Sequence, residues 1–139
     1  MTHAAARWLL VSAALEIVAA SLLGYVMLIP MQPWGKALRD RWPAPRALMS
    51  VHLDMVMLAL MQAAAALGVY AFPSQRDRAA AWLLIASGWL NVTPYAWRLV
   101  GVNAFALAGG AVQRFAASLS FLGTLALTTG WIVLLAGWI

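Results

Sequence analysis

Long apolar stretches separated by short polar connectors make up most of the chain. Four stretches are long enough to cross a bilayer as helices: 8–29, 47–72, 79–100 and 112–138. A helix needs about 20 residues to span the roughly 30 Å hydrocarbon core. The stretches are continuously apolar and rich in Ala and Leu, so they lack the alternation of transmembrane strands. The pattern predicts an all-α integral membrane protein in which a single domain, 1–139, forms a four-transmembrane-helix bundle.

The connectors differ in polarity. Residues 30–46 read PMQPWGKALRDRWPAPR, with four prolines and five charges. They predict a polar loop with a short interfacial segment carrying Trp34 and Trp42. Residues 73–78 predict a tight turn, and residues 101–110 predict a connector with glycines and no charge.

Composition supports the membrane interpretation. Hydrophobic residues make up 65% of the chain, charged residues 9%, and mean hydropathy is +0.85. Soluble domains carry about 25% charged residues. The net charge of +5 comes from nine Lys and Arg, mostly between apolar stretches, which indicates topology and not nucleic-acid binding. The absence of Cys excludes disulfides, thiolate ligands, Cys nucleophiles and c-type haem attachment.

The basic residues predict an orientation. Three lie on the side of the termini: Arg7, Arg76 and Arg78. Six lie on the other side: Lys36, Arg39, Arg41, Arg46, Arg98 and Arg114. This excess favours both termini outside the cytoplasm. If Arg98 and Arg114 serve a functional site instead, the count of basic residues narrows to four against three. Because Glu16 interrupts the first apolar run, that run is interpreted as a retained helix and not as a cleaved signal peptide.

Ionisable side chains inside the second stretch are candidates for function, because each costs about 2.5–3.5 kcal/mol at the centre of a spanning helix. The only histidine besides His52 is His3, near the terminus, so a bis-histidine haem within one subunit is hard to build. A single imidazole can hold a b-type haem and leave one iron face open for a ligand or catalysis. The alternative is a His52 that hydrogen-bonds a neighbouring helix. Asp54 lies about 200° further around the helix, so it is expected to meet a basic side chain or the membrane interface instead.

The third stretch carries a polar stripe, SGWLNVTPYAWR. Helical spacing places Ser87, Asn91, Tyr95 and Arg98 on one face. Pro94 is expected to kink the helix and open carbonyls to a cavity. The stripe can hydrogen-bond a polar substrate atom, or an anionic group such as a haem propionate through Arg98. The alternative is polar packing between helices, especially by Asn91.

Glu16 supports a rival function. The segment ALEIVAASLL resembles the first helix of the small multidrug-resistance transporters, which use a single glutamate to exchange substrate for protons. The resemblance covers that helix only, and the long first connector and His52 have no place in it. Glu16 could equally pair with Arg98 or Arg114 inside the bundle.

The fourth stretch carries hydroxyl side chains at a spacing of four, Ser120, Thr124 and Thr128. They predict a close-packing seam within the bundle or between subunits. No phosphate loop, zinc pattern or Ser-His-Asp order occurs in the sequence.

Two patterns together resemble a known family. His52 begins the second stretch, and Gly88-Trp89-Leu90-Asn91 with Tyr95 follows, His52 and Asn91 being 39 residues apart. This combination resembles styrene oxide isomerase, a small four-span membrane enzyme. The triplet HLD followed by an apolar helix also resembles hydroxylaminobenzene mutase. The resemblance covers roughly residues 49–105.

The resemblance implies a homotrimer in the bacterial inner membrane that binds haem b, with His52 as the axial ligand. It implies that ferric iron acts as a Lewis acid on an epoxide oxygen, and that a 1,2-hydride shift then gives a carbonyl product. Asn91 and Tyr95 would line the pocket of a small lipophilic substrate, an aromatic epoxide or, as the alternative, an arylhydroxylamine. This chain has Leu58 and Ala59 where both families have Asn and Gly, so one substrate-orienting hydrogen bond is missing.

Overall fold

The computed structural model describes residues 2–35, 37 and 45–139, and these residues contain helices and no β-strand. Lys36, Arg39, Arg41 and Trp42, which entered the predicted orientation and interfacial segment, lie outside the described residues. The α-helices are α1 (Thr2–Leu28), α3 (Pro45–Ala71), α4 (Asp77–Asn91), the short α5 (Thr93–Leu99) and α6 (Ala111–Trp138). Two 3-10 turns are η1 (Ile29–Met31) and η2 (Pro33–Gly35).

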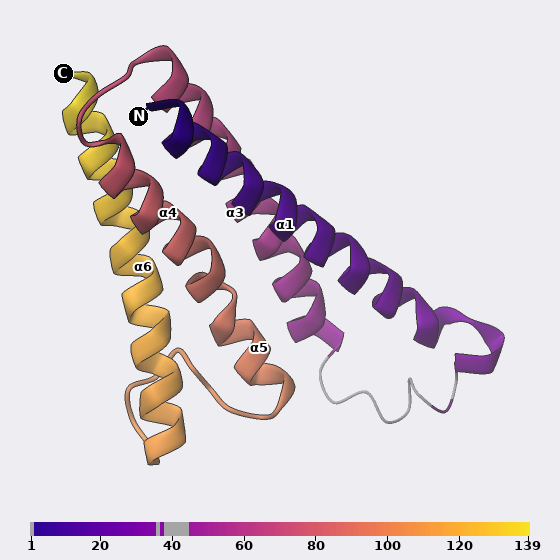
Figure 1. Ribbon diagram of the computed structural model, residues 1–139. Helices are drawn as coiled ribbons and strands as arrows, with labels where there is room; N and C mark the ends of the chain where they lie inside the picture. Colours follow the sequence, from indigo (N-terminus) through magenta and orange to yellow (C-terminus); the bar gives the residue numbers. More distant parts are fainter. Residues whose placement is uncertain (1, 36, 38–44) are drawn as a thin grey trace.

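The helices form two pairs. α1 packs along α3, and α4 packs along α6, with smaller contacts between the pairs. Figure 1 shows the N- and C-termini at the same end of the molecule, and the two pairs diverging toward the opposite end. The pairs therefore meet most closely in the half that holds the termini, and α5 continues α4 into the splayed half.

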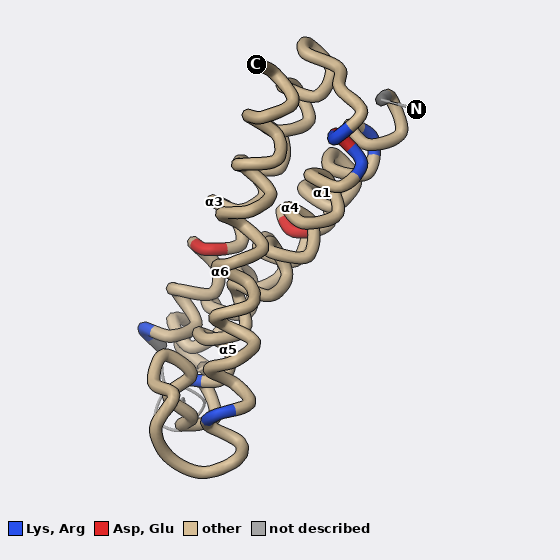
Figure 2. Tube along the Cα trace, turned by 90° about the vertical axis from the view of Figure 1, so that its left-hand side faces the viewer, with Lys and Arg blue, Asp and Glu red and all other residues tan. Residues whose placement is uncertain are grey.

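Three helical segments are long and apolar enough to cross a membrane: His3–Met31, Arg46–Ala71 and Ala111–Trp138. Large apolar side chains cover their outer surface, for example Leu22, Leu60 and Ile132 at 61%, 61% and 59% exposure. Figure 2 shows Lys and Arg near the two ends of the helices, with only acidic residues coloured at mid-height. An apolar girdle between charged ends is the pattern of a membrane protein.

The stretch predicted as the third span, 79–100, is divided into α4 and α5. The break falls at Val92, two residues before Pro94, so the predicted interruption is confirmed. Pro94 has no N–H to donate to the Leu90 carbonyl, and the Thr93 hydroxyl donates to that carbonyl instead, at 2.7 Å. Pro94 was expected to leave carbonyls open to a cavity. For the Leu90 carbonyl this expectation is wrong, because that oxygen accepts a hydrogen bond from the Thr93 hydroxyl.

Small residues set the close approach of α6 to its neighbours. A Cβ at Gly123 would lie 3.0 Å from the Asn91 backbone nitrogen, and one at Gly130 would lie 2.9 Å from Leu84. Glycines on one helix face allow neighbouring backbones to approach. The close-packing seam predicted for the hydroxyl ladder is thus formed chiefly by glycines, and the ladder lies beside it.

The second connector is a tight turn, as predicted. Asp77 begins α4 and accepts hydrogen bonds from the Ser74 backbone N–H and hydroxyl, both at 2.8 Å. An acidic side chain in the first turn also satisfies the positive end of the helix dipole. In the first connector, Trp34 lies in η2 and is exposed.

Candidate functional site

A cavity of about 510 Å³ lies between α3, the α4–α5 segment, α6 and the connector that follows α5. It occupies the splayed half of the molecule, where α3 diverges from α5 and α6 (Figure 1). Its walls are mostly apolar, and several of its apolar residues, such as Met57 and Leu107, are exposed at the rim. Volume and lining match those of pockets for small organic ligands.

Asn91 lies on this cavity at the end of α4. Its Nδ2 donates to the Ser87 carbonyl at 3.1 Å, and its Oδ1 accepts from the Thr124 hydroxyl at 3.2 Å. The Thr124 hydroxyl also lies 3.2 Å from the Ser120 carbonyl, so its single proton is shared between the two acceptors. The bond to Ser87 leaves one N–H of the amide for a ligand. Asn91 therefore makes a polar contact between helices and also lines the cavity, as the two interpretations of the sequence suggested.

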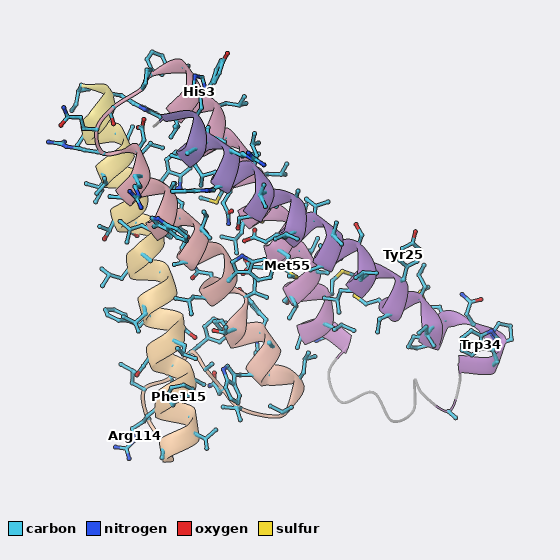
Figure 3. The ribbon with its side chains drawn as sticks, viewed as in Figure 1. His3, Tyr25, Trp34, Met55, Arg114 and Phe115 are labelled. Carbon is cyan, nitrogen blue, oxygen red and sulfur yellow. The ribbon has the colours of Figure 1, made fainter. Side chains whose placement is uncertain are left out.

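Tyr95 reaches the same cavity from α5. Its ring meets Phe105 edge-on, with 5.3 Å between centroids, and it packs against the apolar cluster that includes Val51 and Met55. Figure 3 shows Met55 pointing into the bundle, whereas Tyr25 of α1 points away from it. The Tyr95 hydroxyl makes no hydrogen bond within the described part of the chain, so it can donate to a ligand.

The other two members of the predicted stripe do not join Asn91 and Tyr95. Ser87 is buried and donates to the Leu84 carbonyl at 2.8 Å. Arg98 is exposed, and its guanidinium lies 5.7 Å from the Phe105 ring centroid, outside the cavity lining. Ser87 lies one turn before Asn91 in the buried part of α4, and Arg98 lies at the exposed end of α5, so of the four residues only Asn91 and Tyr95 line the cavity.

His52 faces α1, away from the cavity. Its Nδ1 lies 2.8 Å from the Ala20 carbonyl oxygen, and its Cε1 packs over Gly24. A carbonyl oxygen only accepts, so Nδ1 donates its proton, and in the neutral tautomer that this bond allows the lone pair is on Nε2. This is the arrangement in which a histidine ligates a metal while a backbone carbonyl orients the ring. The bond also realises the alternative predicted from the sequence, a histidine tied to a neighbouring helix.

His3 lies at the far end of the same helix from Ala20, where its ring is 5.8 Å from that of Tyr70. Seventeen residues of helix separate His3 from Ala20, roughly 25 Å at 1.5 Å each. The two histidines therefore cannot share one haem within a chain.

Asp54 occupies a place that the sequence did not predict. It lies on the cavity together with Asn91 and Tyr95, and it forms no ion pair with a basic side chain among the residues that the structure describes. Its separation from His52 around the helix is as expected, since the two residues face different partners. Leu58, one turn further along α3, lines the same cavity. Leu58, which replaces the Asn of the two resembled families, is therefore part of the cavity wall.

Glu16 is buried at the junction of α1, α3 and α4, with no exposed surface. Its Oε1 accepts a hydrogen bond from Gln62 Nε2 at 2.6 Å, and the pair lies against Gly88, where a Cβ would overlap both groups. The alternative pairing with Arg98 or Arg114 is wrong, because both arginines are exposed. Figure 3 shows Arg114 directed away from the bundle.

Sequence reasoning missed two groups of residues in these sites. Gln62 is the partner of Glu16, and its signal was a lone amide within the apolar second stretch. Phe105 and Phe121 contribute aromatic walls to the cavity. No sequence signal distinguishes them from other aromatic residues, because Phe105 lies in a connector whose path depends on the fold.

No cluster of metal-binding side chains of the His, Cys, Asp and Glu types occurs among the described residues. Comparisons of the chain with protein-family models, with curated protein sequences and with solved structures found no match.

Proposed function

We propose that the chain is a membrane-embedded, haem b-dependent isomerase that converts small lipophilic epoxides into carbonyl compounds. The observation that carries the proposal is the cavity that brings together Asn91 and Tyr95, the two residues expected to position such a substrate. An apolar cavity that opens among exposed apolar side chains suits a substrate that partitions into lipid.

The residues around His52 fit an axial ligand to haem. Its Nδ1 is held by the Ala20 carbonyl, and its Nε2 carries the lone pair that iron would take. Haem, when bound, supplies a Lewis-acidic iron that polarises an oxygen atom. Arg98 is exposed at the end of α5 and is available to a propionate, as the sequence suggested.

The chain's own side chains position the substrate and exclude water. The remaining N–H of Asn91 and the hydroxyl of Tyr95 are donors on one cavity wall, suited to hold an epoxide oxygen. The Ser87 carbonyl and the Thr124 hydroxyl, which also contacts the Ser120 carbonyl, orient the Asn91 amide before substrate binds. The apolar remainder of the wall keeps water away from an electron-poor carbon, which would otherwise be hydrated to a diol.

The position of His52 has a consequence for how the copies of the chain would assemble. Within one copy, a haem on His52 and a substrate beside Asn91 would lie on different sides of α3. We therefore propose that the homotrimer brings His52 of one copy to the cavity of the next. In that assembly α4 and α5 together act as the third transmembrane span in chain order and complete the four spans of each copy.

Turnover tests the proposal. Purified protein in lipid nanodiscs, given an aryl epoxide and no reductant, is expected to produce the isomeric aldehyde, and Asn91→Leu is expected to reduce the rate. Co-expression of His52→Ala copies with Asn91→Leu copies is expected to give more activity than either variant alone, because mixed trimers contain complete sites. No aldehyde from any aryl epoxide would refute the epoxide chemistry, and no gain on co-expression would refute the shared site.

Two alternatives give other results in the same preparation. An enzyme of the hydroxylaminobenzene mutase type would rearrange an arylhydroxylamine and leave epoxides unchanged. A proton-coupled transporter would move lipophilic cations in a Glu16-dependent way. The isomerase is favoured over the transporter because Glu16 contacts Gln62 and Gly88 and does not line this cavity.

A further inference from the structure

Asp54 is a carboxyl group on the cavity that the proposed function does not use. It is half-buried on α3 and lines the same cavity as Asn91 and Tyr95. Among the residues that the structure describes, it makes no hydrogen bond and no ion pair. A carboxylate in such surroundings is costly unless a positive charge comes close to it.

The rest of the wall also favours a positive charge. Tyr95, Phe105 and Phe121 place aromatic rings around the cavity, and Met57 and Met61 add polarizable sulfur. Ring faces attract cations, most strongly where water is excluded. The Phe105 ring already contacts one cation, since the Arg98 guanidinium lies 5.7 Å from its centroid.

We propose that this cavity binds a small aromatic organic cation, with Asp54 as the counter-charge and the aromatic rings as the walls. The chemical class is a benzylic or arylalkyl ammonium, whose apolar body fits the lining and whose charge lies near the Asp54 carboxylate. The cavity volume of about 510 Å³ accommodates one such molecule. Arg98 does not compete for Asp54, because it is exposed and lies outside the lining.

If the proposed function holds, the same arrangement serves the rearrangement itself. When the benzylic C–O bond of an epoxide breaks, its electron pair stays on oxygen and positive charge develops on the benzylic carbon. A hydride then moves to that carbon with its electron pair, and the C=O bond forms without net oxidation or reduction. Asp54 would stabilise the charge between these two events, because it lines the cavity in which the substrate would bind.

A matched pair of probes tests the proposal directly. Benzyltrimethylammonium and neopentylbenzene have the same shape and differ in charge, so the difference in their affinities reports the charge preference of the cavity. Binding is measured by saturation-transfer NMR on the whole protein in nanodiscs. Asp54→Asn is expected to weaken binding of the ammonium by about tenfold, equivalent to about 1.4 kcal/mol, and to leave neopentylbenzene binding unchanged.

Controls separate this proposal from the proposed function. Glu16→Gln removes the other intramembrane carboxyl and is expected to leave both affinities unchanged, because Glu16 does not line the cavity. Phe121→Leu keeps an apolar wall without the ring and is expected to weaken the ammonium selectively, which keeps the proposal testable if Asp54→Asn misfolds. Equal affinities for the two probes, or ammonium binding that neither variant weakens, would overturn the cation site whatever the turnover. Cation binding without epoxide turnover would overturn only the isomerase.

Discussion

Glu16 and Gln62 form a hydrogen bond of 2.6 Å between α1 and α3, with both side chains buried. Each also has one oxygen without a partner among the described residues, Oε2 of Glu16 and Oε1 of Gln62. Buried polar groups are costly when unpaired, so this contact holds the helices in one register and is sensitive to change.

Removal of the Glu16 carboxyl tests this contact. Glu16→Ala leaves the Gln62 amide buried without an acceptor and is expected to lower the free energy of unfolding by about 1–3 kcal/mol. Glu16→Gln keeps the size and an acceptor oxygen, so its loss should be much smaller. Unfolding in mixed micelles, followed by circular dichroism, measures both. Equal losses in the two variants would show that the hydrogen bond does not matter.

Gly88→Ala is expected to destabilise the same junction. The added Cβ would overlap Glu16 Oε1 and Gln62 Nε2, and both groups are held inside the three-helix contact. Overpacking of this kind costs about 1–3 kcal/mol. Gly110→Ala is the matched control, because no atom lies within 4 Å of its Cβ position and its φ is −69°. Comparable thermal midpoints for the two variants would contradict the packing at Gly88.

Thr93 and Pro94 are expected to be energetically coupled. In the native chain, Thr93→Val leaves the Leu90 carbonyl without the hydroxyl donor at 2.7 Å and should cost about 1 kcal/mol of stability. In a Pro94→Ala background, the new backbone N–H can reach that carbonyl, so the same substitution should cost less. A double-mutant cycle of unfolding free energies measures the difference. Additive effects would show that Thr93 does not replace the missing proline donor.

The Thr124 hydroxyl is expected to support turnover through Asn91. Thr124→Val removes the bond to Asn91 Oδ1 and should lower kcat/KM for an aryl epoxide by roughly 3–10-fold, the rate equivalent of one hydrogen bond. Thr128→Val is the control, because its hydroxyl bonds only to the Thr124 carbonyl in its own helix. Haem content should be unchanged in both. A similar loss in the control would indicate a general effect on α6.

Much of the fold could be predicted from the sequence. The apolar stretches, the interruption near Pro94 and the turn before Asp77 follow from local composition and backbone chemistry, which act over a few residues. The opposite directions of His52 and Asp54 also follow from helical periodicity.

The residues that complete each site could not be predicted in the same way. The expected place of Asp54, beside a basic side chain or at the membrane interface, did not include the cavity, because local reasoning cannot show which neighbouring helices diverge. Gln62 was missed as the partner of Glu16 because the two lie 46 residues apart and meet only through the pairing of α1 with α3. Arg98 was placed in one stripe with Ser87 because helical spacing cannot show that Ser87 lies in the buried part of α4 and Arg98 at the exposed end of α5.

The absorption spectrum of the purified protein tests the proposed function most directly. The held Nδ1 and free Nε2 of His52 predict a Soret band in the native protein and in His3→Ala, and its loss in His52→Ala. A colourless native protein prepared with haem available, or a Soret band that survives His52→Ala, would contradict haem ligation by His52 and the chemistry proposed with it.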